Sequence, residues 1–325
     1  MLTQQSYKSG YLSERDGHSI HYACYGSPSA SPILFLHGGP GCGFEAGYLP
    51  IFDLSKVNLI TFDQRGTGKS KPFGRLEFNT TQKLIEDIEL LRCHLNISQW
   101  IVTGHSWGTT LGVVYAQQYP ESCSSLVLAS FFGAKKEDQD WTFSGIKRFF
   151  PNEVSQLHAL RQEADQGLTL DEWILKNLCS EDDYLAKLTA YHLLRLEEAS
   201  CKHEQSTVSI DDVTEEILNI YRILFFYAKN SFFIEEEKIY GKALQVPSIL
   251  VHGQFDMDCT PDQAYRLKST SPTLDLRIVR GGNHSVFEDP MRTSFARAVS
   301  DAVTSLSLAP RFSASPICLQ KLDFL

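Results

Sequence analysis

Residues 100–111 read WIVTGHSWGTTL, and this stretch decides the fold. A short apolar strand, 100–103, runs into the GxSxG sequence of residues 104–108, and residues 109–118 then look helical. A GxSxG between a strand and a helix is typical of a nucleophile elbow, a tight turn that pushes its serine out above the sheet edge. The flanking glycines leave room for such a turn, and the N-terminus of the helix favours developing negative charge. We therefore expect Ser106 to be a nucleophile.

Apolar runs and helical spacing alternate on both sides of this stretch. A hairpin is expected near the N-terminus, and helices at 81–95 and 291–306. Buried strands are expected at 33–36, 57–62, 126–129, 247–251 and 274–279. This alternation indicates an α/β fold with a mostly parallel sheet covered by helices on both faces, as in an α/β-hydrolase core.

The alternation breaks near residue 135. Residues 137–240 are charged and helix-like, with few strand candidates. We expect residues 1–136 and 241–325 to form the two parts of the core, and residues 137–240 to form a helical cap inserted between them. The cap holds 21 Asp and Glu against 10 Lys and Arg, a net charge of −11, whereas the remainder holds 18 against 20, a net of +2. Most of these charges fit a solvated helix surface, but such a field also attracts cationic substrates.

A serine hydroxyl needs a base and an oriented acid to act as a nucleophile. In this fold the order along the chain is serine, acid, histidine. His284 fits as the base, because it follows a strand near the C-terminus. Asp256 fits as the acid, because it follows the penultimate strand in a Gly-x-x-Asp turn; Asp258 is its rival. The acid would hold the imidazole tautomer and stabilise the imidazolium.

The oxyanion of acyl transfer needs two backbone N–H donors. One is expected from Trp107, the residue after the serine. The other is expected from the glycine-rich loop after the first buried strand, residues 37–41, where Gly39 is the candidate.

Charge and composition narrow the partners. The chain has 325 residues and a net charge of −9, which argues against a nucleic-acid partner. No segment approaches the apolar length needed to span a bilayer, and the first residues lack the apolar region of a secretory signal. We therefore expect no membrane partner and a cytoplasmic location. No His, Asp and Glu cluster has ligand spacing, so neither a metal nor a cofactor is expected. The oligomeric state stays open.

Several motifs together resemble the proline iminopeptidase (prolyl aminopeptidase) family of α/β hydrolases. They are HGGPG at 37–41, DQRGTGKS at 63–70, GHSWGTTL at 104–111, HGQFDMDCT at 252–260 and GNHS at 282–285. The resemblance covers about residues 10–135 and 245–300 and implies a serine peptidase with a Ser106–His284–Asp256 triad.

In the cap the resemblance is thin. The family binds the free α-amino group of its substrate with cap glutamates. Glu197 matches one of them, although the flanking tryptophans are gone, and Lys229 stands where the other is expected. A lysine would repel an ammonium group. Either the pocket uses Glu197, Glu198 and residues 235–237 differently, or the substrate is not an N-terminal proline.

The leading hypothesis is a serine hydrolase that releases N-terminal proline, or another small residue, from peptides. The alternative is an esterase, lactonase or amidase on the same core, which Lys229 favours. A third hypothesis, a non-catalytic receptor that uses the hydrolase pocket, is disfavoured by the complete triad.

Overall fold

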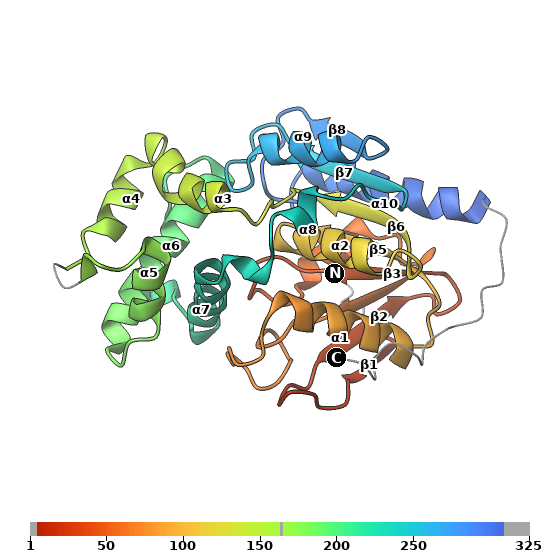
Figure 1. The fold of residues 1–325 in the computed structure, drawn as a ribbon, viewed down its shortest axis with the longest axis horizontal. Helices are drawn as coiled ribbons and strands as arrows, with labels where there is room; N and C mark the ends of the chain where they lie inside the picture. Colours follow the sequence, from red (N-terminus) through yellow and green to blue (C-terminus); the bar gives the residue numbers. More distant parts are fainter. Residues whose placement is uncertain (1–4, 163–164, 309–325) are drawn as a thin grey trace.

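Eight strands form one sheet in the part of the chain, residues 5–162 and 165–308, that the computed structural model describes (Figure 1). Their order across the sheet is β1-β2-β4-β3-β5-β6-β7-β8. The strands are β1 (Lys8–Tyr11), β2 (His21–Gly26), β3 (Ser31–Leu36), β4 (Val57–Phe62), β5 (Trp100–His105), β6 (Cys123–Ala129), β7 (Ser248–Gly253) and β8 (Asp275–Val279).

The sheet is parallel from β4 to β8 and antiparallel only at the β1–β2–β4 edge. The mostly parallel sheet predicted from the sequence is therefore confirmed. Because strands β3, β5, β6, β7 and β8 run the same way, the loops that follow them meet at one edge. In open α/β sheets this carboxyl edge is where ligands bind.

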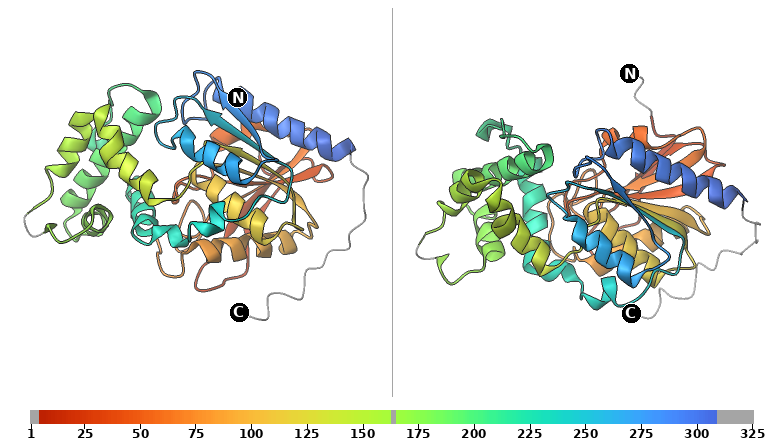
Figure 2. Two further views of the ribbon diagram at one scale, coloured as in Figure 1. Left: turned by 45° about the horizontal axis from the view of Figure 1, so that its top comes forward. Right: turned by 90° about the horizontal axis from the view of Figure 1, so that it is seen from above.

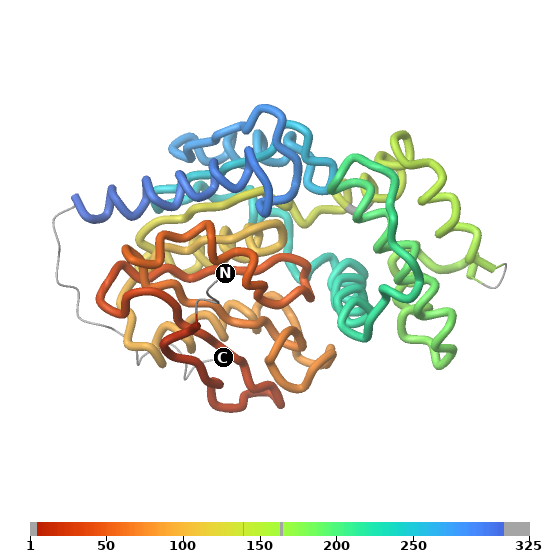
Figure 3. Tube along the Cα trace, turned by 180° about the vertical axis from the view of Figure 1, so that it is seen from behind, coloured from red at the N-terminus to blue at the C-terminus, as the bar shows by residue number. Residues whose placement is uncertain are grey.

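Successive residues of the central strands pack on opposite faces of the sheet, as strand geometry requires. In β3, Leu34 and Leu36 belong to one buried cluster, while Ile33 and Phe35 belong to the other. The first cluster lies under α1 (Thr81–His94), α2 (Trp107–Gln118) and α9 (Pro261–Thr270). The second lies under η1 (Ala46–Ile51) and α10 (Met291–Leu308), and Figure 3 shows α10 crossing the sheet on that side. Both faces are thus covered, which explains the continuous apolar runs of the central strands.

A group of helices projects beyond the carboxyl edge of the sheet (Figures 1 and 2). Its longer members are α4 (Pro151–His158), α5 (Leu170–Leu178), α6 (Asp183–Lys202) and α7 (Glu215–Lys229). The shorter ones are α3 (Lys136–Asp140), η2 (Trp141–Gly145), η3 (Ile146–Arg148), η5 (Ile210–Asp212) and η6 (Ser231–Phe233). These elements fall in the segment expected to form the cap. After them, α8 (Glu237–Tyr240) already packs against α2 and α9 of the core.

The chain leaves and re-enters the core at one place. Lys135, just before α3, forms an ion pair with Glu236, just before α8. The Lys135 ammonium also lies 4.6 Å from the ring centroid of Tyr240. These contacts join the two ends of the inserted segment. The expected second core part, 241–325, includes residues 309–325, which lie outside the described residues.

Two local expectations differ from the structure. The sequence pattern places the strands of the N-terminal hairpin at 11–14 and 19–25, whereas the structure pairs Lys8–Tyr11 with His21–Cys24, and Arg15 and His18 form an isolated bridge between them. Helix α9 follows the acid loop and has no counterpart in the sequence analysis; Pro261 stands in its first turn, where proline is tolerated.

Among the described residues, no helix combines the length and apolarity that crossing a membrane requires.

Candidate active site

Ser106 sits on a strained turn between β5 and α2. Its backbone dihedrals are φ 55° and ψ −126°, a region that non-glycine residues rarely occupy. A Cβ on Gly104 would lie 2.4 Å from the carbonyl oxygen of Gly108, and one on Gly108 would lie 2.1 Å from that of Leu36. Glycine is therefore required on both sides. Between residues 100 and 116 every residue is buried except Ser106, whose side chain lines a cavity.

The side chains of Asp256 and His284 are paired at the carboxyl edge. His284 Nδ1 lies 3.0 and 2.9 Å from the two carboxylate oxygens of Asp256. Burial by itself would lower the pKa of His284, but the carboxylate of Asp256 outweighs it and raises that pKa well above the usual range. Burial likewise tends to raise the pKa of Asp256, but the charge and hydrogen bond of His284 lower it. The pair thus favours an imidazolium facing an ionised carboxylate.

The backbone of His284 is held from below by two side chains. His105 Nε2 and Ser130 Oγ each donate to the carbonyl oxygen of His284, at 3.0 Å. His105 Nδ1 accepts from the Tyr48 hydroxyl at 3.0 Å, which fixes the tautomer. Burial lowers the pKa of His105 to about 3, so its imidazole stays neutral. The residue next to Ser106 therefore fixes the loop that carries His284.

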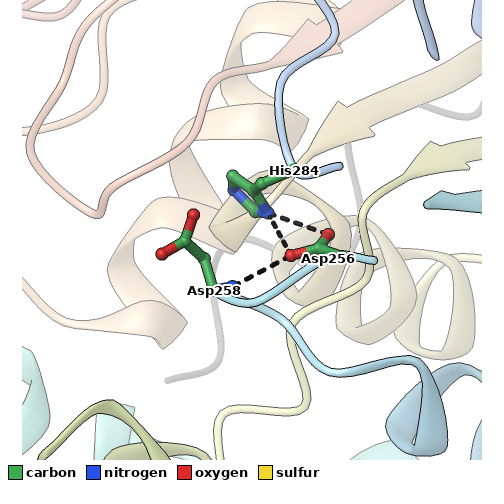
Figure 4. A group of neighbouring side chains, drawn as sticks. All are labelled: Asp256, Asp258 and His284. Atoms are coloured by element: carbon green, nitrogen blue, oxygen red, sulfur yellow. Dashed lines mark hydrogen bonds and ion pairs between the residues drawn. The ribbon is translucent and has the colours of Figure 1, made fainter. Parts of the chain in front are cut away.

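Asp258, the rival acid, has other partners. Its carboxylate accepts from the Ser200 hydroxyl and from Cys201 Sγ, the latter at 2.8 Å. Its backbone N–H donates to Asp256 Oδ1 at 3.1 Å, and Figure 4 shows the Asp256 carboxylate pointing at the His284 ring. Of the two aspartates, Asp256 is the one whose carboxylate bonds the histidine.

Ligand atoms of Asp256, Asp258 and His284 lie within 4.8 Å of one another, a grouping that spacing in the sequence did not predict. Both oxygens of Asp256 face the His284 N–H, and both oxygens of Asp258 accept from cap donors. A metal ion would have to displace these bonds. The hydrogen bonding fits an oriented acid and base better than a metal centre.

The glycine loop after β3 packs directly on Ser106. A Cβ on Gly38 would lie 3.3 Å from the Cβ of Ser106, and Gly39 has φ +110°. His37 Nε2 accepts from the backbone N–H of Gln64 at 3.0 Å, and Gln64 Oε1 accepts from Trp107 Nε1 at 2.9 Å. This chain of bonds ties the loop that carries Gly39 to the elbow that carries Trp107, the two expected oxyanion donors.

The DQRG segment holds the neighbouring loops in place through buried hydrogen bonds and an ion pair. Asp63 accepts from the backbone N–H groups of Phe44 at 2.9 Å and Lys69 at 3.0 Å. Arg65 forms a two-point ion pair with Asp87 of α1, at 2.7 and 2.9 Å. Both residues are buried, so this motif acts as a structural brace.

Ser106 and His284 line a cavity of about 710 Å³ between the sheet edge and the cap. Its apolar wall comes largely from the cap, with Phe143, Leu193, Leu196, Leu224 and Phe225 among the lining residues. Carboxylates line it too, among them Glu45, Glu197 and Asp258. Lys202 also lines the cavity, but it is ion-paired with Glu198. The cavity thus combines an apolar wall with an excess of negative charge, a combination that suits a small apolar group bearing a cation.

Glu197, on α6, points its carboxylate into this cavity. Its Oε2 accepts from the Tyr221 hydroxyl of α7 at 2.6 Å. The side chain is exposed, but its exposed surface faces the cavity. Loss of hydration inside the cavity, with the nearby charge of Asp258, raises the pKa of Glu197 and outweighs the Tyr221 hydrogen bond, which lowers it. No cationic side chain is hydrogen-bonded or ion-paired to it among the described residues, so the charge is open to a ligand cation.

Lys229 lies elsewhere. It is exposed in the last turn of α7 and is absent from the described residues that line the cavity. Of the other glutamates considered for an amine pocket, Glu198 is bonded to Lys202 and Ser206, and Glu236 to Lys135 and Arg266. Glu235 and Glu237 are exposed and are not among the described residues that line the cavity. The structure therefore brings Glu197 to Ser106 and His284, but not Lys229.

Sequence reasoning missed several residues of this site. Tyr221 bonds Glu197, Asn283 bonds the helix that carries Glu197, and His105 bonds the carbonyl oxygen of His284. Asp258 was considered only as a rival acid, not as a contact to α6. Tyr221 and Glu197 are 24 residues apart on different helices, so no local pattern joins them. For His105 and Asn283 the available signal was adjacency to Ser106 and His284.

Comparisons with known proteins agree with this geometry. Residues 31–290 match the family model described as alpha/beta hydrolase fold. The chain is 31% identical to a proline iminopeptidase of Neisseria gonorrhoeae, over 93% of this chain and 98% of that protein. It is 33% identical to a proline iminopeptidase of Arabidopsis thaliana, over 87% of this chain and 77% of that protein.

Solved structures share the fold at lower identity. A proline iminopeptidase-related protein from Thermus thermophilus has a TM-score of 0.59 at 18% identity, covering 92% of this chain and 98% of that one. A putative aryl esterase from Burkholderia cenocepacia has a TM-score of 0.58 at 20% identity, covering 92% of this chain and all of that one. At such identities they support the fold alone. From the family match and the identities above, the chain is a hydrolase that belongs to the proline iminopeptidase family of α/β hydrolases.

Proposed function

We propose that this hydrolase is an aminopeptidase that releases N-terminal proline, or another small residue, from short peptides. In the proposed mechanism Ser106 is the nucleophile, His284 the general base and Asp256 the acid that orients it. Gly39 and Trp107 supply the oxyanion donors, and Glu197 binds the α-ammonium group of the substrate.

The reaction divides into acylation and deacylation. Ser106 Oγ attacks the scissile carbonyl while His284 Nε2 takes its proton, and Asp256 stabilises the resulting imidazolium. The tetrahedral oxyanion accepts from the backbone N–H of Gly39, in the loop after β3, and from that of Trp107, at the N-terminus of α2. His284 then gives the proton to the leaving amine, and the C–N bond breaks. Water attacks the acyl-Ser106 ester by the same route and releases the free amino acid.

One observation carries the substrate assignment: the Glu197 carboxylate faces the cavity that Ser106 and His284 also line. An ammonium held by a carboxylate in such a partly enclosed site gains a charge-assisted hydrogen bond. It would fix the first residue of a peptide so that the first peptide bond meets Ser106. The phenolic O–H of Tyr221 holds the carboxylate in place at 2.6 Å.

The observation that favoured the alternative function, an esterase, lactonase or amidase, does not hold in the structure. That observation was the positive charge of Lys229, and Lys229 is exposed outside the described lining of the cavity. A prolyl substrate is therefore preferred, and the ester serves as a comparison in the test.

The test compares three substrates: proline-β-naphthylamide, its N-acetylated form and p-nitrophenyl acetate. We expect the free-amine prolyl amide to turn over and the N-acetylated form to be cleaved at least about tenfold less efficiently, because acetylation removes the ammonium. Ser106→Ala should abolish cleavage of all three. If the ester is cleaved through Ser106 while the prolyl amide is inert, the triad assignment survives and the aminopeptidase proposal is wrong.

A further inference from the structure

Two loops carry the proposed acid and base, and both also hold the cap. The acid loop contacts α6 and η2 through residues beside Asp256. The Asp258 carboxylate accepts from Ser200 and Cys201 of α6, and the Met257 carbonyl oxygen accepts from Trp141 Nε1 of η2 at 2.7 Å. The base loop contacts α6 through Asn283, whose Nδ2 donates to the carbonyl oxygen of Cys201 at 3.0 Å.

These contacts fall at the C-terminal end of α6, where hydrogen bonds are scarce. The last carbonyls of a helix have no partner within it. Helix α6 ends at Lys202, and His203 beyond it is left-handed with φ 58°. Asn283 therefore satisfies one terminal carbonyl of α6, that of Cys201. Ser200 is 1% exposed, so its bond to Asp258 is shielded from water.

Glu197 stands four residues before Cys201 on the same helix. Residues four apart in a helix lie on one face, one above the other. Pinning Cys201 to the acid and base loops therefore fixes where the Glu197 carboxylate stands relative to the triad. On its other side, Glu197 is held by Tyr221 of α7. Helix α7 in turn touches the glycine loop, because a Cβ on Gly41 would lie 2.7 Å from the carbonyl oxygen of Ile220.

We propose that Asp258 and Asn283 are positioning residues that set the spacing between the amine anchor Glu197 and the reacting carbonyl. This inference rests on the proposed aminopeptidase function and deepens it. The two residues do not touch the reacting atoms. They make cleavage depend on a free α-amine, because a substrate held by Glu197 reaches Ser106 only when α6 is seated on the two loops.

The test breaks the same contact from each side. Asp258→Asn removes the charged acceptor on the core, and the double variant Ser200→Ala/Cys201→Ala removes the donors on the cap and leaves the acid loop unaltered. The readouts are KM and kcat for proline-β-naphthylamide and for p-nitrophenyl acetate. Asp262→Asn is a matched control, because it makes the same chemical change on an exposed residue four positions further along.

We expect both variants to lower kcat/KM for the prolyl amide about tenfold, mainly through KM, because misplacing a bound group by a fraction of an ångström is costly. Ester hydrolysis should stay within about twofold for Ser200→Ala/Cys201→Ala, because that variant leaves the triad and the charge of Asp258 beside it unaltered. Combining the two changes should lower prolyl cleavage no further than either alone, because they remove one shared interaction. The control should match wild type.

Equal losses on both substrates would overturn the inference, because that is the result of a merely structural role. Wild-type activity of both variants on both substrates would also overturn it, as would full additivity of the two variants. If wild type itself does not prefer the free prolyl amide over its N-acetylated form, the proposed function fails and this inference with it. That outcome is seen before any variant is measured.

Discussion

The core and the cap contribute to the candidate site in opposite ways. In the core, residues 100–116 are buried except for Ser106, and the strained elbow fixes that side chain through backbone geometry. In the cap, Glu197 reaches the cavity from an α-helix and is held by the side chain of Tyr221. The cap also carries a net charge of −11, against +2 for the remainder.

This difference suggests that the core sets the rate of bond cleavage and the cap sets which substrates are bound. Backbone strain and glycine contacts specify where Ser106 stands, so the position of this proposed nucleophile depends on a few neighbouring residues. The position of Glu197 depends on how whole helices are seated against the core. Changes in the core should therefore affect every substrate, whereas changes in the cap should affect only substrates with a free amine.

The largest effect is expected in the core. Ser106→Ala should lower kcat about 10⁴- to 10⁶-fold for amide and ester alike, because removing one member of a triad removes most of its contribution. The measurement is steady-state kinetics with labelling by a fluorophosphonate. Ser305→Ala, on the exposed face of α10, is the control. A variant that kept more than about a hundredth of wild-type activity would show that Ser106 is not the nucleophile.

A smaller and selective effect is expected in the cap. Glu197→Gln should raise KM for proline-β-naphthylamide about 10- to 100-fold, because a hydrogen bond to a charged group contributes about 1.5–3 kcal/mol. Hydrolysis of p-nitrophenyl acetate should stay within about twofold, since the ester carries no ammonium.

Glu198→Gln is the matched control for that change. Glu198 is the next residue on α6, but its carboxylate is bonded to Lys202 and Ser206 and does not line the cavity among the described residues. It should leave KM for the prolyl amide unchanged. Equal effects of the two variants would mean that the cap acts through its overall charge, and a matching loss of ester hydrolysis would mean that Glu197 supports the fold.

The strands and the candidate catalytic residues of the core could be predicted from the sequence, because the patterns that indicate them are local. The apolar run before Gly104 and the helix after Gly108 identify the elbow, and β4 was placed at the residues where it occurs, Val57–Phe62. Asp256 and His284 could be chosen because each follows a strand, and parallel strands bring their following loops to one edge. Helix α9 was missed because it lacks a long apolar period, although Pro261 marks its start.

The side-chain positions in the cap could not be predicted in the same way. Glu197 was found through a weak resemblance, but its partner Tyr221 lies 24 residues away and shares no pattern with it. Lys229 was aligned with a family glutamate, yet its side chain is exposed in the last turn of α7. The orientation of a helical side chain depends on how the helix is rotated against its neighbours, and that is decided by tertiary packing.

The pH dependence should separate the two regions as well. The carboxylate of Asp256 raises the pKa of His284, and a protonated imidazole cannot accept the Ser106 proton. Ester kcat/KM should therefore fall about tenfold per pH unit on the acid side, with a midpoint above about 6.5. For the prolyl amide a second fall is expected above about pH 8, as the substrate amine loses the proton that Glu197 recognises. An ester midpoint at or below about 6.5 would contradict the raised pKa.

The smallest effect is expected where the family resemblance predicted a large one. If Lys229 faced the substrate, Lys229→Glu would restore an amine ligand and lower KM for the prolyl amide severalfold. The structure instead places Lys229 in the exposed last turn of α7, where its positive charge interacts favourably with the negative end of the helix dipole. We therefore expect KM and kcat within about twofold of wild type, and a loss of stability of about 0.3–1 kcal/mol, measured as a small fall in Tm. Lys187→Glu, an exposed charge reversal on α6, controls for net charge. A lower KM for Lys229→Glu but not for Lys187→Glu would mean that α7 turns Lys229 toward the substrate during catalysis, and the assignment of amine recognition to Glu197 alone would fail.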